Sequence, residues 1–181
     1  TEEKRLVDSG ALFTKPETWT PDGKAVVYNT LSGETGVDLW LYNVDGATPP
    51  KALLSTRFNE SDAEISPDGR WMVYRSGETG RSEMYVRSFP DMGEKYRISD
   101  DALGTFDGST FFWVQWRNDG REILFPGTDG LTMVSVEIGP GPGFHAGTPR
   151  ALFRLPVNTF NAAIAPNGEK FLAFAPDTGG I

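Results

Sequence analysis

The chain has 181 residues, of which 38% are hydrophobic and 12% aromatic, so it can build a globular domain with its own core, and general disorder is excluded. Its 17 Lys and Arg against 25 Asp and Glu give a formal net charge of −8, which argues against nucleic acid as a partner. There is no cysteine, so disulfides and thiolate metal sites are excluded as well.

The first repeated element along the chain is a turn motif that occurs four times. It reads WTPDGKAVVY from Trp19, ISPDGRWMVY from Ile65, WRNDGREILF from Trp116 and IAPNGEKFLAF from Ile164. The Asp or Asn residues of the copies follow one another at intervals of 46, 51 and 48 residues. Intervals of this length are typical of β-propellers, in which each repeat is one four-stranded blade.

Each copy predicts a hairpin between two antiparallel strands. Asp and Asn hydrogen-bond their own turn, and Gly adopts a positive φ without a Cβ clash. The predicted structural turn residues are Asp22, Gly23, Asp68, Gly69, Asp119, Gly120, Asn167 and Gly168. We expect the apolar residue three positions before each Asp or Asn to be buried between neighbouring blades; these residues are Trp19, Ile65, Trp116 and Ile164.

A second glycine turn follows the second predicted strand in the first three copies. It reads SGETG at 32–36 and again at 76–80, and GTDG at 127–130. A third strand with alternating apolar residues begins near Asp38, Glu83 and Leu131, and a shorter fourth strand is expected at about 51–54, 95–98 and 150–153. Asp38 and Glu83 are equivalent in the repeat, and we expect them to accept backbone amides near this turn.

Four strands and two glycine turns per repeat, without an amphipathic helical segment, predict an all-β fold: a β-propeller of about four four-stranded antiparallel blades. We assign one propeller domain to 1–181, with repeats at about 13–58, 59–106, 107–154 and 155–181, the last completed by 1–12. A β-sandwich is the alternative fold, but it lacks this regular self-similarity. The blades could form a closed small ring, an arc of a larger ring, or an arc whose unpaired edges join two chains as a homodimer.

The stretch ISPDGRWMVYRSGETGRSEMYVRSFP resembles the repeat of TolB-like propellers, which are WD-type with a Pro-Asp-Gly turn. It is most similar to propeller regions C-terminal to bacterial serine/threonine protein kinases, and the resemblance extends over about 13–175. The resemblance implies a non-enzymatic binding or scaffold module in a larger bacterial sensor or envelope protein. It also implies a location outside the cytoplasm, such as the periplasm.

No catalytic constellation accompanies the repeats, so we expect that the protein is not an enzyme. The single histidine, His145, lies in the Gly/Pro-rich segment 139–147, which lacks the Lys-Ser/Thr of a phosphate loop, and no G-x-S-x-G motif occurs. No cofactor or metal site is predicted; a Ca²⁺ ion in the central channel stays open, although no D-x-D-x-D-G loop accompanies it. The alternative function is a hydrolase or lyase on sugars, lactones or peptides, with carboxylates at the channel mouth.

The connections between blades carry the residues predicted to bind a partner. Each connection combines a phenylalanine with short polar residues, and this is the composition of a protein-binding surface, although the rings could instead fill spaces between blades. The predicted partner-binding residues are Arg57, Phe58, Asn59, Glu60, Phe106, Asp107, Asn158, Phe160 and Asn161. A protein or peptide is the predicted partner, and no apolar run approaches the roughly 20 residues that membrane insertion requires.

Overall fold

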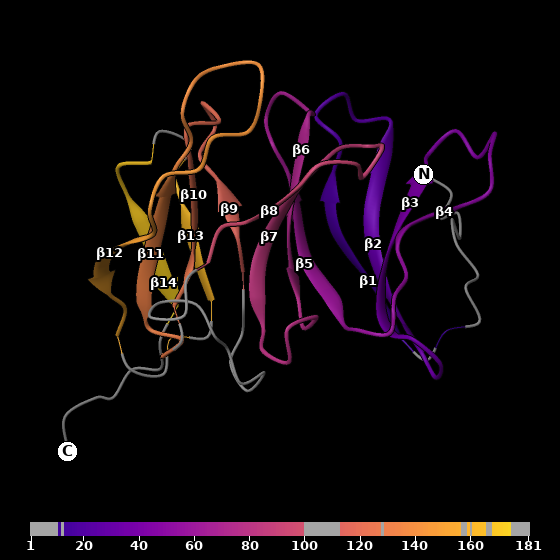
Figure 1. Ribbon diagram of the computed structural model, residues 1–181, viewed down its shortest axis with the longest axis horizontal. Coiled ribbons are helices and arrows are strands. Elements are labelled where there is room, and N and C mark those ends of the chain that lie inside the picture. Colours follow the sequence, from indigo (N-terminus) through magenta and orange to yellow (C-terminus); the bar gives the residue numbers. More distant parts are fainter. Residues whose placement is uncertain are drawn as a thin grey trace.

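The computed structural model consists of β-strands and their connections (Figure 1) and describes residues 11, 13–99, 113–127, 129–156, 159, 161–165 and 168–174. These residues form three four-stranded sheets and one two-stranded sheet. They contain no helix, and therefore none that could cross a membrane. The all-β character predicted from the repeats is confirmed.

Each sheet is one blade, and its strands follow one another in chain order with antiparallel pairing. Blade 1 contains β1 (Phe13–Trp19), β2 (Ala25–Ser32), β3 (Gly36–Asn43) and β4 (Lys51–Leu54). Blade 2 contains β5 (Glu60–Ile65), β6 (Trp71–Ser76), β7 (Glu83–Ser88) and β8 (Lys95–Arg97). Blade 3 contains β9 (Gln115–Trp116), β10 (Glu122–Pro126), β11 (Thr132–Glu137) and β12 (Arg150–Arg154), and blade 4 contains β13 (Asn161–Ile164) and β14 (Phe171–Phe174).

The first strands of the blades lie next to one another, as the inner strands of a propeller do. β5 contacts both β1 and β9, and Figure 1 shows the three complete blades side by side in chain order. β13 and β14 pair with each other, and no other described strand joins their sheet. The segment expected to complete blade 4, residues 1–12, lies outside the described residues except for Ala11, so closure of the ring stays a prediction.

The four Asp-Gly or Asn-Gly turns share one backbone geometry. The glycine amide donates to the carbonyl three residues earlier at 2.8 Å, and the φ of the glycine lies between 70° and 75°, at Gly23, Gly69, Gly120 and Gly168. Through Oδ1, Asp22, Asp68 and Asp119 each accept the amide two residues later at 3.0–3.1 Å, while Asn167 lies outside the described residues. The left-handed backbone explains why a glycine follows each turn aspartate.

Replacing Gly69 by alanine is expected to lower the free energy of unfolding by about 1–2 kcal/mol, because a Cβ disfavours its φ of +73°. The added Cβ would meet only the Pro21 ring, at an ordinary contact distance of 3.8 Å, so the loss reports backbone geometry and not crowding. Gly33→Ala is the control, since its φ is not left-handed and no described atom lies within 4 Å of the added Cβ. Urea unfolding compares the variants, and equal stability would contradict the turn geometry.

The core consists of one hydrophobic layer at each junction between blades. Ile65 packs against blade 1, Trp116 against blade 2 and Ile164 against blade 3. On the other side of these junctions lie Val27, Val73 and Leu124, which occupy one repeat position in β2, β6 and β10. Every blade therefore has a front, which packs on the preceding blade, and a back, which the next blade covers.

The prediction that Trp19 is buried at this position was wrong. Trp19 is 57% exposed, because among the described residues no blade precedes blade 1 and covers its front. At the other end of the arc, Leu172 has the repeat position of Leu124 on the back of blade 4 and is 59% exposed. Burial of these positions thus depends on the neighbouring blade and not on the side chain alone.

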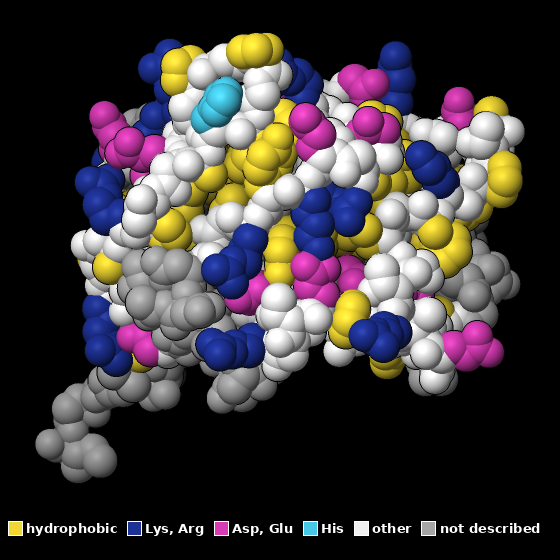
Figure 2. Space-filling model, viewed as in Figure 1, with side chains coloured by type: hydrophobic (Ala, Val, Ile, Leu, Met, Phe, Trp, Pro, Cys, Tyr) yellow, Lys and Arg dark blue, Asp and Glu magenta, His cyan; other side chains and the backbone are white. Residues whose placement is uncertain are grey.

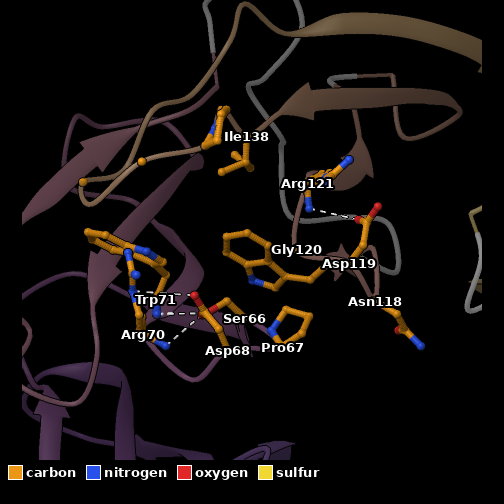
Figure 3. A pocket seen from close by; sticks show the side chains of 15 residues that line it. Ser66, Pro67, Asp68, Arg70, Trp71, Asn118, Asp119, Gly120, Arg121 and Ile138 are labelled. Atoms are coloured by element: carbon orange, nitrogen blue, oxygen red, sulfur yellow. Dashed lines mark hydrogen bonds and ion pairs between the residues drawn. The ribbon is translucent and has the colours of Figure 1, made fainter.

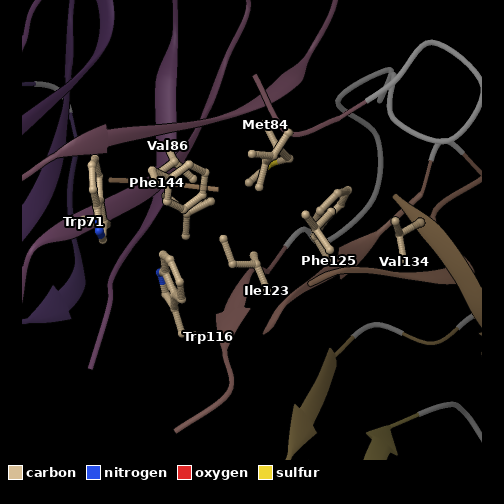
Figure 4. Close-up of a cluster of buried hydrophobic side chains, with 11 residues drawn as sticks. Trp71, Met84, Val86, Trp116, Ile123, Phe125, Val134 and Phe144 are labelled. Carbon is tan, nitrogen blue, oxygen red and sulfur yellow. The ribbon is translucent and has the colours of Figure 1, made fainter. Parts of the chain in front are cut away.

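The connection between the third and fourth strands of a blade reaches back to the preceding blade. In blade 3 this connection inserts Phe144 beside Trp71 and Trp116 of the junction, at ring-centroid distances of 5.2 and 6.4 Å (Figure 4). In blade 2, Met92 of the connection between β7 and β8 packs into the junction with blade 1 in the same way. The Gly/Pro-rich segment 139–147, expected only as a connection, therefore joins two blades.

Candidate functional site

The two rims of the arc carry different loops (Figure 1). The rim at the top of the figure, called here the upper face, carries the Asp-Gly turns and the connections between third and fourth strands. The lower face carries the second glycine turns and the connection between blades 1 and 2, residues 55–59. Of the predicted partner-binding residues, those of the connection between blades 1 and 2 belong to the lower face.

Four of these residues lie in the connection between blades 1 and 2 and at the start of β5. Arg57 is exposed, and its guanidinium carbon lies 4.9 Å from the centre of the half-buried Phe58 ring. Asn59 is exposed, but its Oδ1 accepts the Val37 amide at 3.0 Å and so ties the connection to blade 1. Glu60 is buried, so its carboxylate does not lie at the surface. A partner-binding role of Arg57, Phe58 and Asn59 stays a prediction.

The other predicted partner-binding residues cannot be placed around a common surface. Phe106, Asp107, Asn158 and Phe160 lie outside the described residues, and Asn161 is described only as the first residue of β13. The part of the lower face that they were expected to form therefore also stays a prediction.

The carboxylates of the second glycine turns bind hydroxyl groups. Thr35 Oγ1 donates to Asp38 Oδ2 at 2.6 Å, and Thr79 Oγ1 donates to Glu83 Oε2 at 3.0 Å. The expectation of backbone amide donors was wrong, because the hydroxyl group of a threonine in each turn supplies the hydrogen bond. Both carboxylates are buried at the base of the lower face.

A cleft of about 690 Å³ opens on the upper face between blades 2 and 3 (Figure 3). The turns at 66–70 and 118–121 form two of its sides, and Ile138 with the glycine-rich residues after it forms a third. Trp71 and Trp116, both buried, line its base. Sequence analysis missed this cleft, because it depends on how two blades and one loop meet; the only signal was the lone Phe144 among glycines and prolines.

The acidic groups of the cleft already have partners. Asp68 accepts the Ser66 hydroxyl at 2.6 Å and lies 3.6 Å from Arg70. Asp119 pairs with the Arg117 guanidinium at 2.7 Å, and the hydrogen bonds of this pair hold the pKa of Asp119 at about 2. Neither carboxylate therefore offers an isolated negative charge to a ligand.

Two arginines with the same repeat position differ in their contacts. Arg70 donates to the Pro142 carbonyl at 3.2 Å and stacks over Trp71 at 6.0 Å, so it is held across the junction. Arg121 is exposed, and no described residue accepts a hydrogen bond or ion pair from its guanidinium. Arg121 is therefore the cationic group of the rim that remains available to a ligand.

A smaller cleft of about 230 Å³ lies at the inner strands, between β1 and β5. Glu17 and Asp62 line it with nearly buried side chains, 3.3 Å and 3.9 Å from the amino group of Lys15. Asp62 also pairs with Arg75 at 2.6 Å, and its φ of 51° is left-handed at the bulge where the pairing of β5 with β6 shifts. Burial raises the pKa of Glu17, and the charge of Lys15 opposes this effect.

Glu64 lines the same cleft and joins blade 2 to blade 3. Its Oε2 accepts the Trp116 amide at 2.6 Å, and its backbone carbonyl accepts the Trp116 indole at 3.3 Å. Burial of the carboxyl raises the pKa of Glu64 to about 8, against the effect of the amide. Gln115, the equivalent residue of blade 3, exchanges two hydrogen bonds of 3.1 and 3.4 Å with the Ile164 backbone. Sequence analysis missed this joining position.

Within the described part of the chain, no three His, Cys, Asp or Glu side chains are placed together to hold a metal ion. His145 is exposed; the cyan histidine stands at the top of Figure 2, on the upper face. The same view shows acidic and basic side chains interspersed over the surface.

No protein-family profile matches the chain. One curated relative, an uncharacterized protein of Agrobacterium fabrum, is 29% identical over 86 residues, which make up 48% of this chain and 28% of the relative. Among solved structures, a TolB-like protein from Agrobacterium tumefaciens matches 93% of this chain with a TM-score of 0.63 and 20% identity. TolB from Acinetobacter baumannii matches 92% with a TM-score of 0.63 and 19% identity. The fold is a TolB-like β-propeller.

This TolB-like propeller spans only part of its structural neighbours: 61% of the Agrobacterium protein and 38% of Acinetobacter TolB. A Bacteroides uniformis protein named as a 6-phosphogluconolactonase also matches 91% of the chain, over 48% of its own length, with a TM-score of 0.60 and 16% identity. Identities this low show the fold and not the activity. The predicted TolB-like propeller is confirmed, while its closer similarity to kinase-linked propellers stays a prediction.

Proposed function

We propose that this TolB-like propeller is a non-enzymatic binding module in a larger bacterial protein, and that its partner is a protein or peptide. The cleft between blades 2 and 3 would receive an extended segment of that partner. The observation that carries this proposal is an open cleft of about 690 Å³ with aromatic side chains at its base and Arg121 at its rim, whose guanidinium forms no hydrogen bond or ion pair with a described residue.

The size and lining of the cleft fit a short peptide segment. Ligand pockets measure about 300–1,000 Å³, and they combine an apolar lining with a few polar groups that fix orientation. Arginine and tryptophan are also the residues most often found at the centre of protein-binding sites. Because Asp68 and Asp119 are paired with Arg70 and Arg117, the guanidinium of Arg121 is the rim group that can bind an acidic side chain or a terminal carboxylate of the partner.

A phage-displayed library of random peptides, panned against the purified chain, tests this proposal. We expect enrichment of peptides that combine an acidic residue with an apolar one. Arg121→Glu is expected to weaken binding of the enriched peptides at least tenfold, because it replaces the attractive charge of the rim by a repulsive one. Fluorescence anisotropy with labelled synthetic copies measures the affinity.

Lys24→Glu is the matched control. Lys24 has the same repeat position as Arg121 and is exposed, but it lies on blade 1, away from the cleft lining. The change in net charge is identical in the two variants, so a long-range electrostatic effect would weaken binding equally. Failure to enrich any peptide, or equal affinity for both variants, would overturn the proposal for this cleft.

The lower face and the ends of the arc offer further contacts. Arg57 and Phe58 could add to a partner interface there, in line with the sequence prediction. The homodimer through unpaired blade edges is also a prediction, and analytical ultracentrifugation tests it directly. A sharp monomer at all protein concentrations would contradict the dimer without bearing on the cleft.

A second candidate function is an enzyme with carboxylates at the inner strands. The observation that favours it is the cleft of Glu17, Asp62 and Glu64, where burial raises the pKa of Glu17 and Glu64 while Asp62 is paired with Arg75. Carboxyl groups with unequal proton affinity are the usual acid and base of hydrolytic sites. The fold likeness to a protein named as a lactonase points in the same direction.

A screen of esters, lactones and glycosides tests this second candidate. Turnover that Asp62→Asn abolishes, while Asp22→Asn on the upper face leaves it unchanged, would replace the binding module by an enzyme. Absence of turnover over all three substrate classes would count against it.

A further inference from the structure

Two buried carboxylates lie at the junction of blades 1 and 2, beneath the lower face. Asp38 in β3 and Glu60 in β5 are only 3% and 2% exposed. The residues before them are in direct contact, since Asn59 Oδ1 accepts the Val37 amide at 3.0 Å. Burial raises the pKa of Glu60, and the neighbouring charge of Asp38 raises it further. Two buried carboxylates therefore lie near enough to repel each other across the junction.

Each of these carboxylates accepts a hydrogen bond through only one of its two oxygens. Thr35 Oγ1 donates to Asp38 Oδ2, and Thr56 Oγ1 donates to Glu60 Oε1, both at 2.6 Å. Asp38 Oδ1 and Glu60 Oε2 are buried, and no described residue donates to either. A buried carboxylate oxygen without a donor is costly, and two of them at one junction call for a positive charge.

In blade 2 the carboxylate at the repeat position of Asp38 is paired with an arginine, and blade 1 has no arginine at the equivalent place. Glu83, the equivalent of Asp38, receives the hydroxyls of Thr79 and Tyr85 on one oxygen and the Arg97 guanidinium at 2.9 Å on the other. Arg97 stands opposite Tyr85 in the pairing of β7 with β8. In blade 1 the residue at that place, opposite Trp40 in the pairing of β3 with β4, is Ala52, which has no charge.

We propose that a calcium ion binds between Asp38 and Glu60 and takes the place that Arg97 has in blade 2. The two unpartnered carboxylate oxygens are its charged ligands, and the Thr35 and Thr56 hydroxyls are neutral ligands beside them. Calcium suits this set better than magnesium, because it accepts oxygen ligands in an irregular arrangement and fills its shell with carbonyls and water. With two carboxylates only, the dissociation constant should be weak, about 10⁻⁴ to 10⁻³ M.

Thermal unfolding with and without calcium chloride tests the site. We expect the midpoint temperature of the native chain to rise by several degrees when calcium exceeds its dissociation constant, and magnesium at equal ionic strength to give a smaller rise. Asp38→Asn and Glu60→Gln are expected to abolish the calcium-dependent rise. Both should also raise the midpoint in the absence of calcium, because each removes one of two neighbouring charges.

Glu34→Gln is the control for surface charge, since Glu34 is an exposed residue of the turn next to Asp38. It should keep the full response to calcium. Terbium luminescence, excited through tryptophan, measures ion binding in the native chain without any substitution, and calcium should displace the terbium. A calcium response that persists in Asp38→Asn would overturn the proposal. A native chain that binds neither calcium nor terbium would also overturn it, and a proton shared by the two carboxylates would then balance their charges.

Discussion

Replacing Trp116 by alanine is expected to lower the free energy of unfolding by about 3–5 kcal/mol. Trp116 is 3% exposed in the junction of blades 2 and 3, where it contacts Phe144 and donates its indole hydrogen to the Glu64 carbonyl. The substitution removes this packing and leaves a partly buried carbonyl without the indole donor. Since small domains are stable by only about 5–15 kcal/mol, chemical denaturation should show a large shift of the midpoint.

Trp19→Ala is the matched control for this experiment. Trp19 has the same repeat position and the same side chain, but it is largely exposed at the front of blade 1. We expect a loss below about 1 kcal/mol, as for substitutions on the surface. Equal losses for the two tryptophans would mean that Trp19 is also covered in solution, and would contradict the open front of blade 1.

The stability of the protein is expected to fall as the pH rises, through Glu64. Its pKa is about 8 in the folded chain against an ordinary value of 4.5, so folding favours the protonated carboxyl. The stabilisation is complete below about pH 4.5 and is lost as the pH rises through about 8. A tenfold change in proton affinity is worth about 1.4 kcal/mol, so the loss amounts to several kcal/mol.

Glu64→Gln is expected to remove this part of the pH dependence. The amide oxygen of glutamine can accept the Trp116 amide as Glu64 Oε2 does, and Gln115 already makes such bonds to blade 4. Urea unfolding between pH 5 and pH 9 should give the variant a flatter profile and a higher stability than the native chain at pH 9. Glu34→Gln, at an exposed turn, controls for the loss of one charge; native-like profiles for both variants would show that Glu64 does not titrate as stated.

The architecture could be predicted from the sequence because its signals are local. The Asp-Gly turns fix a backbone geometry that depends on two residues, and the same φ near +70° recurs at Gly23 and Gly69. The strand pairing then follows from alternation and short connections. Even the two strands of the incomplete fourth repeat follow from this pattern.

The candidate sites were harder to predict because they form between repeats. The upper cleft needs the turns of two blades and a loop that carries Phe144 across the junction. Glu60 is a charged residue and was therefore expected at the surface, but its position in β5 places its side chain in the interior. Glu64 and Gln115 differ in charge, so their common role in joining blades was not visible until their hydrogen bonds to Trp116 and Ile164 were known.

Because every blade packs through the same front and back positions, a chain of this kind can gain a blade by duplication of one repeat. Each junction uses the same kinds of residue: an apolar side chain from the front, a Val or Leu on the back and an apolar side chain from a loop. The exposed Trp19 and Leu172 belong to packing surfaces of this kind that no described blade covers. A copied repeat added at either end would find its packing surface already present, so the gene can lengthen the arc by one unit without redesigning the rest.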